Sequence, residues 1–143
     1  RLASMESCSG GLSASTITDN PGSSEYFKGG LVAYTREMKI AFGVPENTIN
    51  KYGMVSPETA QAMARAAREL LKGDVGVGIT GVAGPSEMEG KKPGIVHIAV
   101  DCLNKVSHYK GNIVGDRIMV KQRAVTAALF ELRKALLNIN PKS

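Results

Sequence analysis

A serine that follows an apolar segment and precedes two glycines is the first candidate for chemistry in this sequence. Ser7 stands within residues 5–11 (MESCSGG), and the helix-compatible run 12–18 follows. The pattern predicts a strand, a tight turn and a helix start, where free backbone N–H groups stabilise an anion or a developing oxyanion. It makes Ser7 a candidate nucleophile, although the same residues more often form only a cap and turn.

The base that would activate Ser7 has to be sought outside histidine, because His97 and His108 both fall inside predicted strands. Lysine or tyrosine can take this role, as in the Ser–Lys variants of acyl-transfer sites. Lys39 is the candidate, since a short helix after a strand end can turn it back toward the rim of the sheet, beside Tyr34. A solvated surface lysine is the competing interpretation.

Four further signals are weaker. Cys8 is a rival nucleophile, although a small buried hydrophobe is the commoner role of such a residue. Two isolated histidines without clustered carboxylates do not predict a metal site. Residues 76–81 match G-x-G-x-x-G, but these glycines lie within a predicted strand and lead into a loop rather than a helix, so we reject dinucleotide binding. Residues 80–85 are predicted to turn at the carboxyl end of that strand, either as a ligand-binding rim or as a plain turn.

The composition is that of a single domain. With 143 residues and 43% hydrophobic content the chain can bury one core, and no apolar run approaches the roughly 20 residues that span a bilayer. The net charge of +5 is spread along the chain and aromatic residues make up 5%, which argues against nucleic-acid binding and suits a small anionic substrate. The two cysteines, Cys8 and Cys102, are too few for a disulfide framework and favour a cytoplasmic location. Neither nucleic acid nor a membrane is expected as a partner.

The elements that must position these residues alternate between strand and helix. Strands are predicted at residues 30–34, 74–80, 94–100 and 106–110, and helices at 12–18, 35–42, 56–73 and 115–141. Residues 43–55 are predicted to be a connector, 86–93 a polar loop, and Asn104-Lys105 the turn of an antiparallel hairpin. The sum is a three-layer α/β/α domain over residues 1–143, with a mixed, mostly parallel sheet.

Six segments resemble the CinA C-terminal domain family in their order and spacing, across nearly the whole chain. They are ESCSGG (6–11), PGSS (21–24), GLVAY (30–34), YGMVS (52–56), TGVAGP (80–85) and GDR (115–117). The resemblance implies a three-layer hydrolase, often oligomeric, that deamidates nicotinamide mononucleotide to nicotinic acid mononucleotide and ammonia in pyridine nucleotide salvage. It implies no cofactor. The alternative is a non-catalytic module that binds a nucleotide or docks a partner.

Carried onto this chain, the resemblance assigns the catalytic roles to Ser7, Lys39 and Tyr34, and makes Arg117 a cation for the 5′-phosphate. Either Lys39 or Tyr34 would take the serine proton, and backbone N–H groups of residues 8–11 would donate to the oxyanion. The substrate-binding residues are expected to be Cys8, Ser9, Gly10, Gly11, Ser24, Thr80, Gly81, Ala83, Gly84 and Arg117.

Three features depart from the family's pattern. Glu37 and Lys39 match the family's pattern, but Arg36 adds a charge beside them. Residues 86–90 form a bulkier and more acidic loop where the family has a glycine-rich one. Both changes predict an altered substrate affinity. The helix that normally precedes the first strand is absent, which predicts a lower stability of the isolated chain.

Overall fold

The structure of the protein is a computed structural model that describes residues 1–103 and 105–139. Its elements are β1 (Leu2–Glu6), α1 (Leu12–Thr18), a 3₁₀ turn (Ser23–Glu25), β2 (Phe27–Val32), α2 (Arg36–Ala41), α3 (Glu46–Tyr52), α4 (Pro57–Leu70), β3 (Val75–Gly81), β4 (Ile95–Cys102), β5 (Lys105–Asn112) and α5 (Arg117–Ile139). The predicted turn residue Asn104 and the predicted helix end at Pro141 lie outside the described residues. No helix in the described part of the chain is long and apolar enough to cross a membrane.

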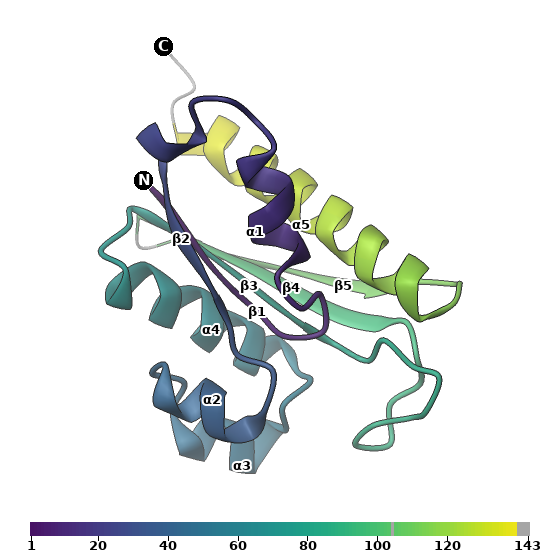
Figure 1. The fold of residues 1–143 in the computed structure, drawn as a ribbon. Coiled ribbons are helices and arrows are strands. Elements are labelled where there is room, and N and C mark those ends of the chain that lie inside the picture. Colours follow the sequence, from purple (N-terminus) through teal and green to yellow (C-terminus); the bar gives the residue numbers. More distant parts are fainter. Residues whose placement is uncertain (104, 140–143) are drawn as a thin grey trace.

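One sheet orders the described strands as β2-β1-β3-β4-β5 (Figure 1). β1 pairs in parallel with both β2 and β3, so the carboxyl ends of these three strands meet at one edge of the sheet. β4 joins β3 in antiparallel fashion and β5 joins β4 in the same way, as the predicted hairpin requires. The mixed sheet is therefore confirmed, and its parallel half can gather residues that follow three strand ends.

Helices cover both faces of the sheet, which confirms the predicted three layers (Figure 1). α1 and α5 pack on one face, where Val77 and Ala124 belong to the same buried apolar cluster. α4 covers the other face, with α2 and α3 beside it, and a second cluster there contains Met5 and Met63. β1 contributes to both clusters because successive side chains of a strand point to opposite faces.

Two glycines of β3 allow α4 to lie almost against the strand backbone. A Cβ atom added at Gly76 would lie 1.9 Å from the carbonyl oxygen of Ala64, and one added at Gly78 would lie 2.2 Å from that of Ala60. The prediction that these glycines admit another backbone is confirmed. They lie inside β3 rather than between a strand and a helix, so they do not form a dinucleotide-binding turn.

The second strand begins earlier than the sequence predicts. β2 starts at Phe27 rather than Gly30, and it ends at Val32, before Ala33 and Tyr34. Its exposure alternates from residue to residue, but Gly29 and Gly30 interrupt the apolar pattern that would show this. Hydrophobic periodicity therefore does not predict the first half of this strand.

The prediction of a connector at residues 43–55 is wrong for the middle of this segment, which forms the helix α3. This helix has seven residues, and Ile49 is its buried residue. Such a short element with so small an apolar face shows almost no helical period in the sequence. Ile49 joins the cluster that contains Met63 of α4, so tertiary packing stabilises α3 more than its own sequence does.

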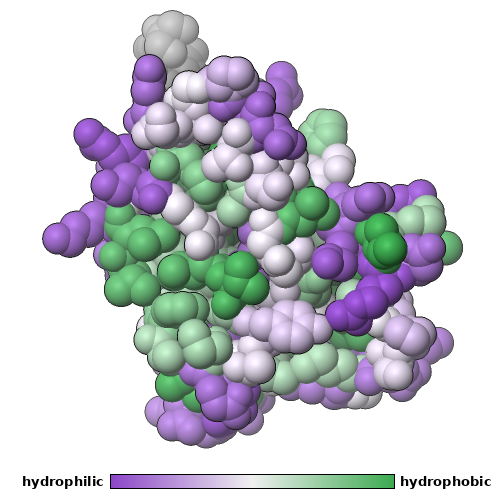
Figure 2. Space-filling view, viewed as in Figure 1, coloured by the Kyte–Doolittle hydropathy of each residue, from purple (hydrophilic) through white to green (hydrophobic). Residues whose placement is uncertain are grey.

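The edge of the sheet at β2 is partly apolar on its solvent side. On the face shown in Figure 2, apolar side chains gather over β2 and the C-terminal end of α4. Val32 is 44% exposed and Leu70 is 53% exposed. The family resemblance implies a homo-oligomer, and the subunits of a homo-oligomer would bury an apolar surface of this kind between them.

Candidate active site

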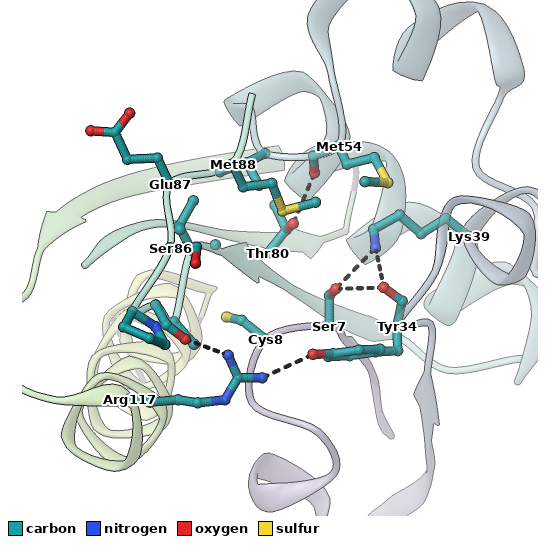
Figure 3. A pocket seen from close by; sticks show the side chains of 16 residues that line it. Ser7, Cys8, Tyr34, Lys39, Met54, Thr80, Ser86, Glu87, Met88 and Arg117 are labelled. Carbon is teal, nitrogen blue, oxygen red and sulfur yellow. Dashed lines mark hydrogen bonds between the residues drawn. The ribbon is translucent and has the colours of Figure 1, made fainter. Parts of the chain in front are cut away.

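A cavity of about 430 Å³ opens at the edge of the sheet where the parallel strands end (Figure 3). β1 leads into it at Ser7, β2 at Tyr34, and β3 at Gly81. The loop after β3 (residues 82–88), the turn before α4 and the start of α5 complete the walls. Ligands usually bind at this edge in open α/β sheets, so the topology alone makes the cavity a candidate active site.

A serine–lysine pair lies in the wall of this cavity. Nζ of Lys39 is 2.9 Å from Oγ of Ser7. The amine also donates to the carbonyl oxygens of Ala33 at 2.9 Å and of Tyr34 at 3.4 Å. Oγ of Ser7 is 3.4 Å from the same Tyr34 carbonyl oxygen. A neutral amine held in this way has a lone pair within reach of the serine proton.

α2 brings Lys39 to Ser7. Thr35 caps this helix by accepting a hydrogen bond from the N–H of Met38, so the helix begins soon after β2 ends. The lysine side chain is only 1% exposed, so it is not the solvated surface lysine of the competing interpretation. Burial disfavours the ammonium form and lowers the pKa of Lys39 to about 8, although the charges of Cys8 and Glu89 act in the opposite direction.

The loop that carries Ser7 is folded around the carboxylate of Glu6. Oε1 of Glu6 accepts hydrogen bonds from the hydroxyl of Ser9 at 2.7 Å and from the N–H groups of Gly11 and Ser13, each at 3.0 Å. Oε2 accepts from the N–H of Ala14 at 3.0 Å. Glu6 is fully buried. Its carboxylate therefore satisfies the free donors at the start of α1 and fixes the turn immediately after the nucleophile.

The backbone N–H groups of the two residues after Ser7 differ as oxyanion donors, because Cys8 lines the cavity whereas Ser9 is fully buried and does not. Those of Cys8 and Ser9 form no hydrogen bond to an oxygen acceptor among the described residues. Burial raises the pKa of the Cys8 thiol to about 11, although these same N–H groups and Lys39 act against the increase. The thiolate of Cys8 is therefore scarce at neutral pH, which weakens the case for Cys8 as the rival nucleophile.

Tyr34 takes part in the site through two different groups. Its carbonyl oxygen lies beside Ser7 and Lys39, whereas its phenol points away from them toward Arg117 (Figure 3). Nη2 of Arg117 donates to the Tyr34 hydroxyl at 2.9 Å, and Nη1 donates to the carbonyl oxygen of Gly84 at 2.6 Å. Of the two candidate bases, only Lys39 thus has its titrating atom next to Ser7.

The structure brings most of the predicted site residues together, but four lie elsewhere. Ser9 is fully buried and its hydroxyl donates to Glu6. Gly10 and Gly11 form a separate shallow groove with residues of α5. Ser24 precedes β2 and so lies at the opposite end of that strand. The predicted residues that line the cavity are Ser7, Cys8, Tyr34, Lys39, Thr80, Gly81, Ala83, Gly84 and Arg117.

The histidines and Arg36 are directed to other parts of the fold. Nδ1 of His97 is 3.0 Å from Nε2 of His108, and both residues lie in strands, as predicted, without lining the cavity. Arg36 hydrogen-bonds Glu46 at 3.2 Å and also contacts Asn50, so its charge joins α2 to α3 instead of facing the cavity. In the described part of the chain, no three His, Cys, Asp or Glu side chains gather as metal ligands.

Several residues in or next to the cavity have roles that the sequence does not predict. Glu6 does not line the cavity but caps the turn after Ser7, and a carboxylate at the end of an apolar strand, just before a helix, is a usable signal for such capping. The cavity is also lined by Met54, from the turn before α4, and by Met88, from the loop after β3. Glu89 follows Met88 and accepts a hydrogen bond from the N–H of Met54 without lining the cavity. No local pattern indicates that these two segments meet.

Replacing Glu6 with glutamine should weaken both the fold and the turn after Ser7. An amide nitrogen would then face a backbone or hydroxyl donor, so we expect the free energy of unfolding to fall by about 1–3 kcal/mol. Ser9→Ala, which removes one of the donors and leaves the carboxylate, should cost about 1 kcal/mol. Urea titration measures both losses. A Glu6→Gln variant as stable as the wild type would contradict the structural role given to this carboxylate.

Fold and cavity define a three-layer α/β protein with a buried serine–lysine pair at the carboxyl edge of its parallel strands. Comparison with known proteins adds the family. The sequence model of the CinA C-terminal domain matches residues 1–136. The chain belongs to the CinA C-terminal domain family.

Relatives and solved structures agree with this assignment. The chain is 46% identical to a putative competence-damage inducible protein of Halothermothrix orenii, over 94% of this chain and 33% of that protein. It is 42% identical to a CinA-like protein of Fervidobacterium nodosum, over 92% of this chain and 33% of that protein. The chain thus spans about one third of the length of these curated relatives.

Among solved structures, the chain resembles the competence or damage-inducible protein from Enterobacter asburiae with a TM-score of 0.92 and 30% identity, covering 95% of this chain and 87% of that one. The competence/damage-inducible protein CihA from Agrobacterium tumefaciens gives a TM-score of 0.89 and 33% identity, covering 94% and 84% of the two chains. The three-layer α/β fold is therefore that of CinA-family proteins.

Proposed function

We propose that this domain is an amidohydrolase that deamidates nicotinamide mononucleotide to nicotinic acid mononucleotide and ammonia, with Ser7 as nucleophile. The observation that carries the proposal is the 2.9 Å contact between Nζ of the buried Lys39 and Oγ of Ser7 in a cavity open to solvent. The resemblance to the CinA family supplies the substrate. A Ser–Lys pair is a known arrangement for acyl transfer.

The reaction proceeds through attack of Oγ of Ser7 on the carboxamide carbon, while neutral Lys39 takes the serine proton. The N–H group of Cys8, which lines the cavity, donates to the oxyanion of the tetrahedral intermediate. Lys39 then returns the proton to the amide nitrogen, the C–N bond breaks, and ammonia leaves an acyl-Ser7 ester. Water, deprotonated by Lys39, attacks this ester and releases the carboxylic acid and free Ser7. All steps use groups of this chain and water.

Arg117 is suited to bind the 5′-phosphate at the mouth of the cavity. Its guanidinium has five donors, of which one is directed to Gly84 and one to Tyr34, so other N–H groups remain for an anion. Arg117 is exposed at the start of α5, which leaves the charge accessible to a ligand. A planar guanidinium binds phosphate oxygens in a bidentate manner.

Arg117→Ala should weaken the binding of nicotinamide mononucleotide by about 1.5–3 kcal/mol, which is the range for a charge-assisted hydrogen bond. Nicotinamide riboside lacks the phosphate, so its KM should change far less. Because Arg117 also joins Tyr34 to Gly84, the riboside separates loss of the phosphate contact from loss of this link. Equal losses on the two substrates would remove Arg117 from phosphate binding.

The test of the proposed function is ammonia release from a panel of amides that includes nicotinamide mononucleotide. We expect this compound to be the best substrate of the panel. The alternative is a binding module, which would bind the nucleotide in a titration but release no ammonia. Binding without turnover, under conditions where the protein is folded, would favour that alternative.

A further inference from the structure

Glu89 links the loop after β3 to the turn before α4. Oε2 of Glu89 accepts a hydrogen bond from the N–H of Met54 at 2.8 Å, and Oε1 accepts one from the N–H of Val55 at 2.9 Å. Its side chain is 28% exposed and is also 3.7 Å from the ammonium of Lys91. One carboxylate thus holds two neighbouring backbone donors of a segment far away in the sequence.

The turn before α4 is shaped to receive this carboxylate. Gly53 has a φ of 87°, a conformation that favours glycine. A Cβ atom at this position would lie 2.9 Å from both carboxylate oxygens of Glu89. The close approach of Glu89 therefore depends on a glycine at position 53 for space as well as for backbone conformation.

The contact fixes one wall of the cavity. The N–H of Met54 is held by Glu89, and its carbonyl oxygen accepts a hydrogen bond from the hydroxyl of Thr80 at 2.8 Å. Met88 precedes Glu89 directly, and its own backbone pairs with Lys91. In Figure 3, the side chains of Met54 and Met88 lie on the opposite side of the cavity from Arg117. Both methionines thus border the space above Ser7.

We propose that Glu89 is a positioning residue that holds Met54 and Met88 as the wall against which the aromatic ring of the substrate packs. This inference rests on the proposed function, since it concerns the ring that bears the carboxamide. Thioethers make favourable contacts with aromatic rings and adapt to their outline. A wall of two methionines gains affinity when its backbone is already ordered before the ligand arrives.

The experiment uses two variants of Glu89 that separate charge from reach. Glu89→Gln keeps the length of the side chain but loses the charge and one acceptor, whereas Glu89→Asp keeps the charge but is one methylene shorter. Glu37→Gln, which removes an exposed acidic side chain from the helix that carries Lys39, is the charge-matched control. A small organofluorophosphonate, from which Oγ of Ser7 displaces fluoride, labels the nucleophile. Nicotinamide mononucleotide is added to protect it.

We expect the concentration of nicotinamide mononucleotide that gives half-protection to rise about tenfold in both Glu89 variants. Labelling without nucleotide should stay within about twofold of the wild-type rate in Glu89→Asp, because this variant retains both the Ser7–Lys39 pair and the carboxylate charge. Glu89→Gln also removes a charge that raises the pKa of Lys39, so its labelling without nucleotide should become faster near neutral pH. Amide hydrogen exchange at Met54 and Val55 should become faster. If charge alone mattered, Glu89→Gln would lower the half-protecting concentration, because the loss of a carboxylate strengthens the binding of an anionic nucleotide. Glu37→Gln should therefore not weaken protection.

Several outcomes would overturn the proposal. An unchanged half-protecting concentration in Glu89→Asp would show that the length of the side chain is unimportant. An equal rise of this concentration in Glu37→Gln would assign the effect to charge. Protection of the wild type without ammonia release would remove the hydrolytic function and leave the role of Glu89 standing. Normal ammonia release with unchanged half-protection in both Glu89 variants would remove the role of Glu89 alone. If the nucleotide gives the wild type no protection, both proposals fail.

Discussion

Ammonia release from nicotinamide mononucleotide is expected to fall by roughly a thousandfold or more in Ser7→Ala, because the variant has no oxygen with which to form the acyl intermediate. The fold should survive the change. Among the described residues, Oγ of Ser7 forms hydrogen bonds only with Lys39 and the Tyr34 carbonyl oxygen, and the backbone N–H of Ser7 keeps its hydrogen bond to the Ile79 carbonyl oxygen at 2.9 Å. An ammonia assay together with a thermal melt measures both expectations.

Residual turnover would decide between this role and the alternatives. A Ser7→Ala variant that keeps more than about a tenth of the wild-type rate would make Ser7 a cap residue, with Cys8 or an activated water as the nucleophile. Cys8→Ala distinguishes these two possibilities. Because the pKa of the Cys8 thiol is raised to about 11 by burial, we expect this variant to retain activity within about tenfold of the wild type.

The parts of the fold that the sequence predicts well are those with local signals. α4 could be placed because its N-cap, Ser56, accepts a hydrogen bond from the N–H of Thr59 and Pro57 occupies the first helical position. The turn after β1 could be placed because its glycines follow an apolar run; Gly10 and Gly11 both have positive φ values. Each of these signals depends only on residues a few positions apart.

The parts that could not be predicted depend on which strands lie side by side. Lys39 was a candidate from its place after a strand, but its burial follows from the parallel pairing of β1 with β2, which no local pattern specifies. The separation of the Tyr34 phenol from Ser7 has the same origin, because Arg117 arrives from α5 at the far end of the chain. Glu89 likewise meets Met54 only after β3 and α4 have packed.

Lys39→Met should remove both the activity and its dependence on pH near 8. The proposed mechanism needs the neutral amine, and the pKa of Lys39 is lowered to about 8 by burial. In the wild type, kcat/KM should therefore rise about tenfold per pH unit below 8 and become level above it. Methionine has a similar length and no titrating group. The rate of the variant, measured from pH 6 to 10, should be low throughout.

Tyr34→Phe tests the other candidate base. The phenol donates nothing to Ser7 and serves Arg117 instead, so this variant should lose part of its affinity for the nucleotide while keeping the rise of kcat/KM toward pH 8. The roles would be reversed if Tyr34→Phe were inactive and Lys39→Met retained the wild-type pH dependence.

The free energy of unfolding provides a check on Lys39 that does not depend on any substrate. The pKa of Lys39 is about 8 in the folded protein against an ordinary value of 10.5, so between these two pH values the unfolded chain binds more protons than the folded one. Stability should therefore increase as the pH rises from 8 to 10.5, by up to about 3 kcal/mol from this residue. Lys39→Met should lack that increase when both proteins are unfolded with urea across this range. If the two curves run parallel, the lysine titrates as it would in solvent, and a neutral Lys39 at physiological pH would then be too scarce to act as the base.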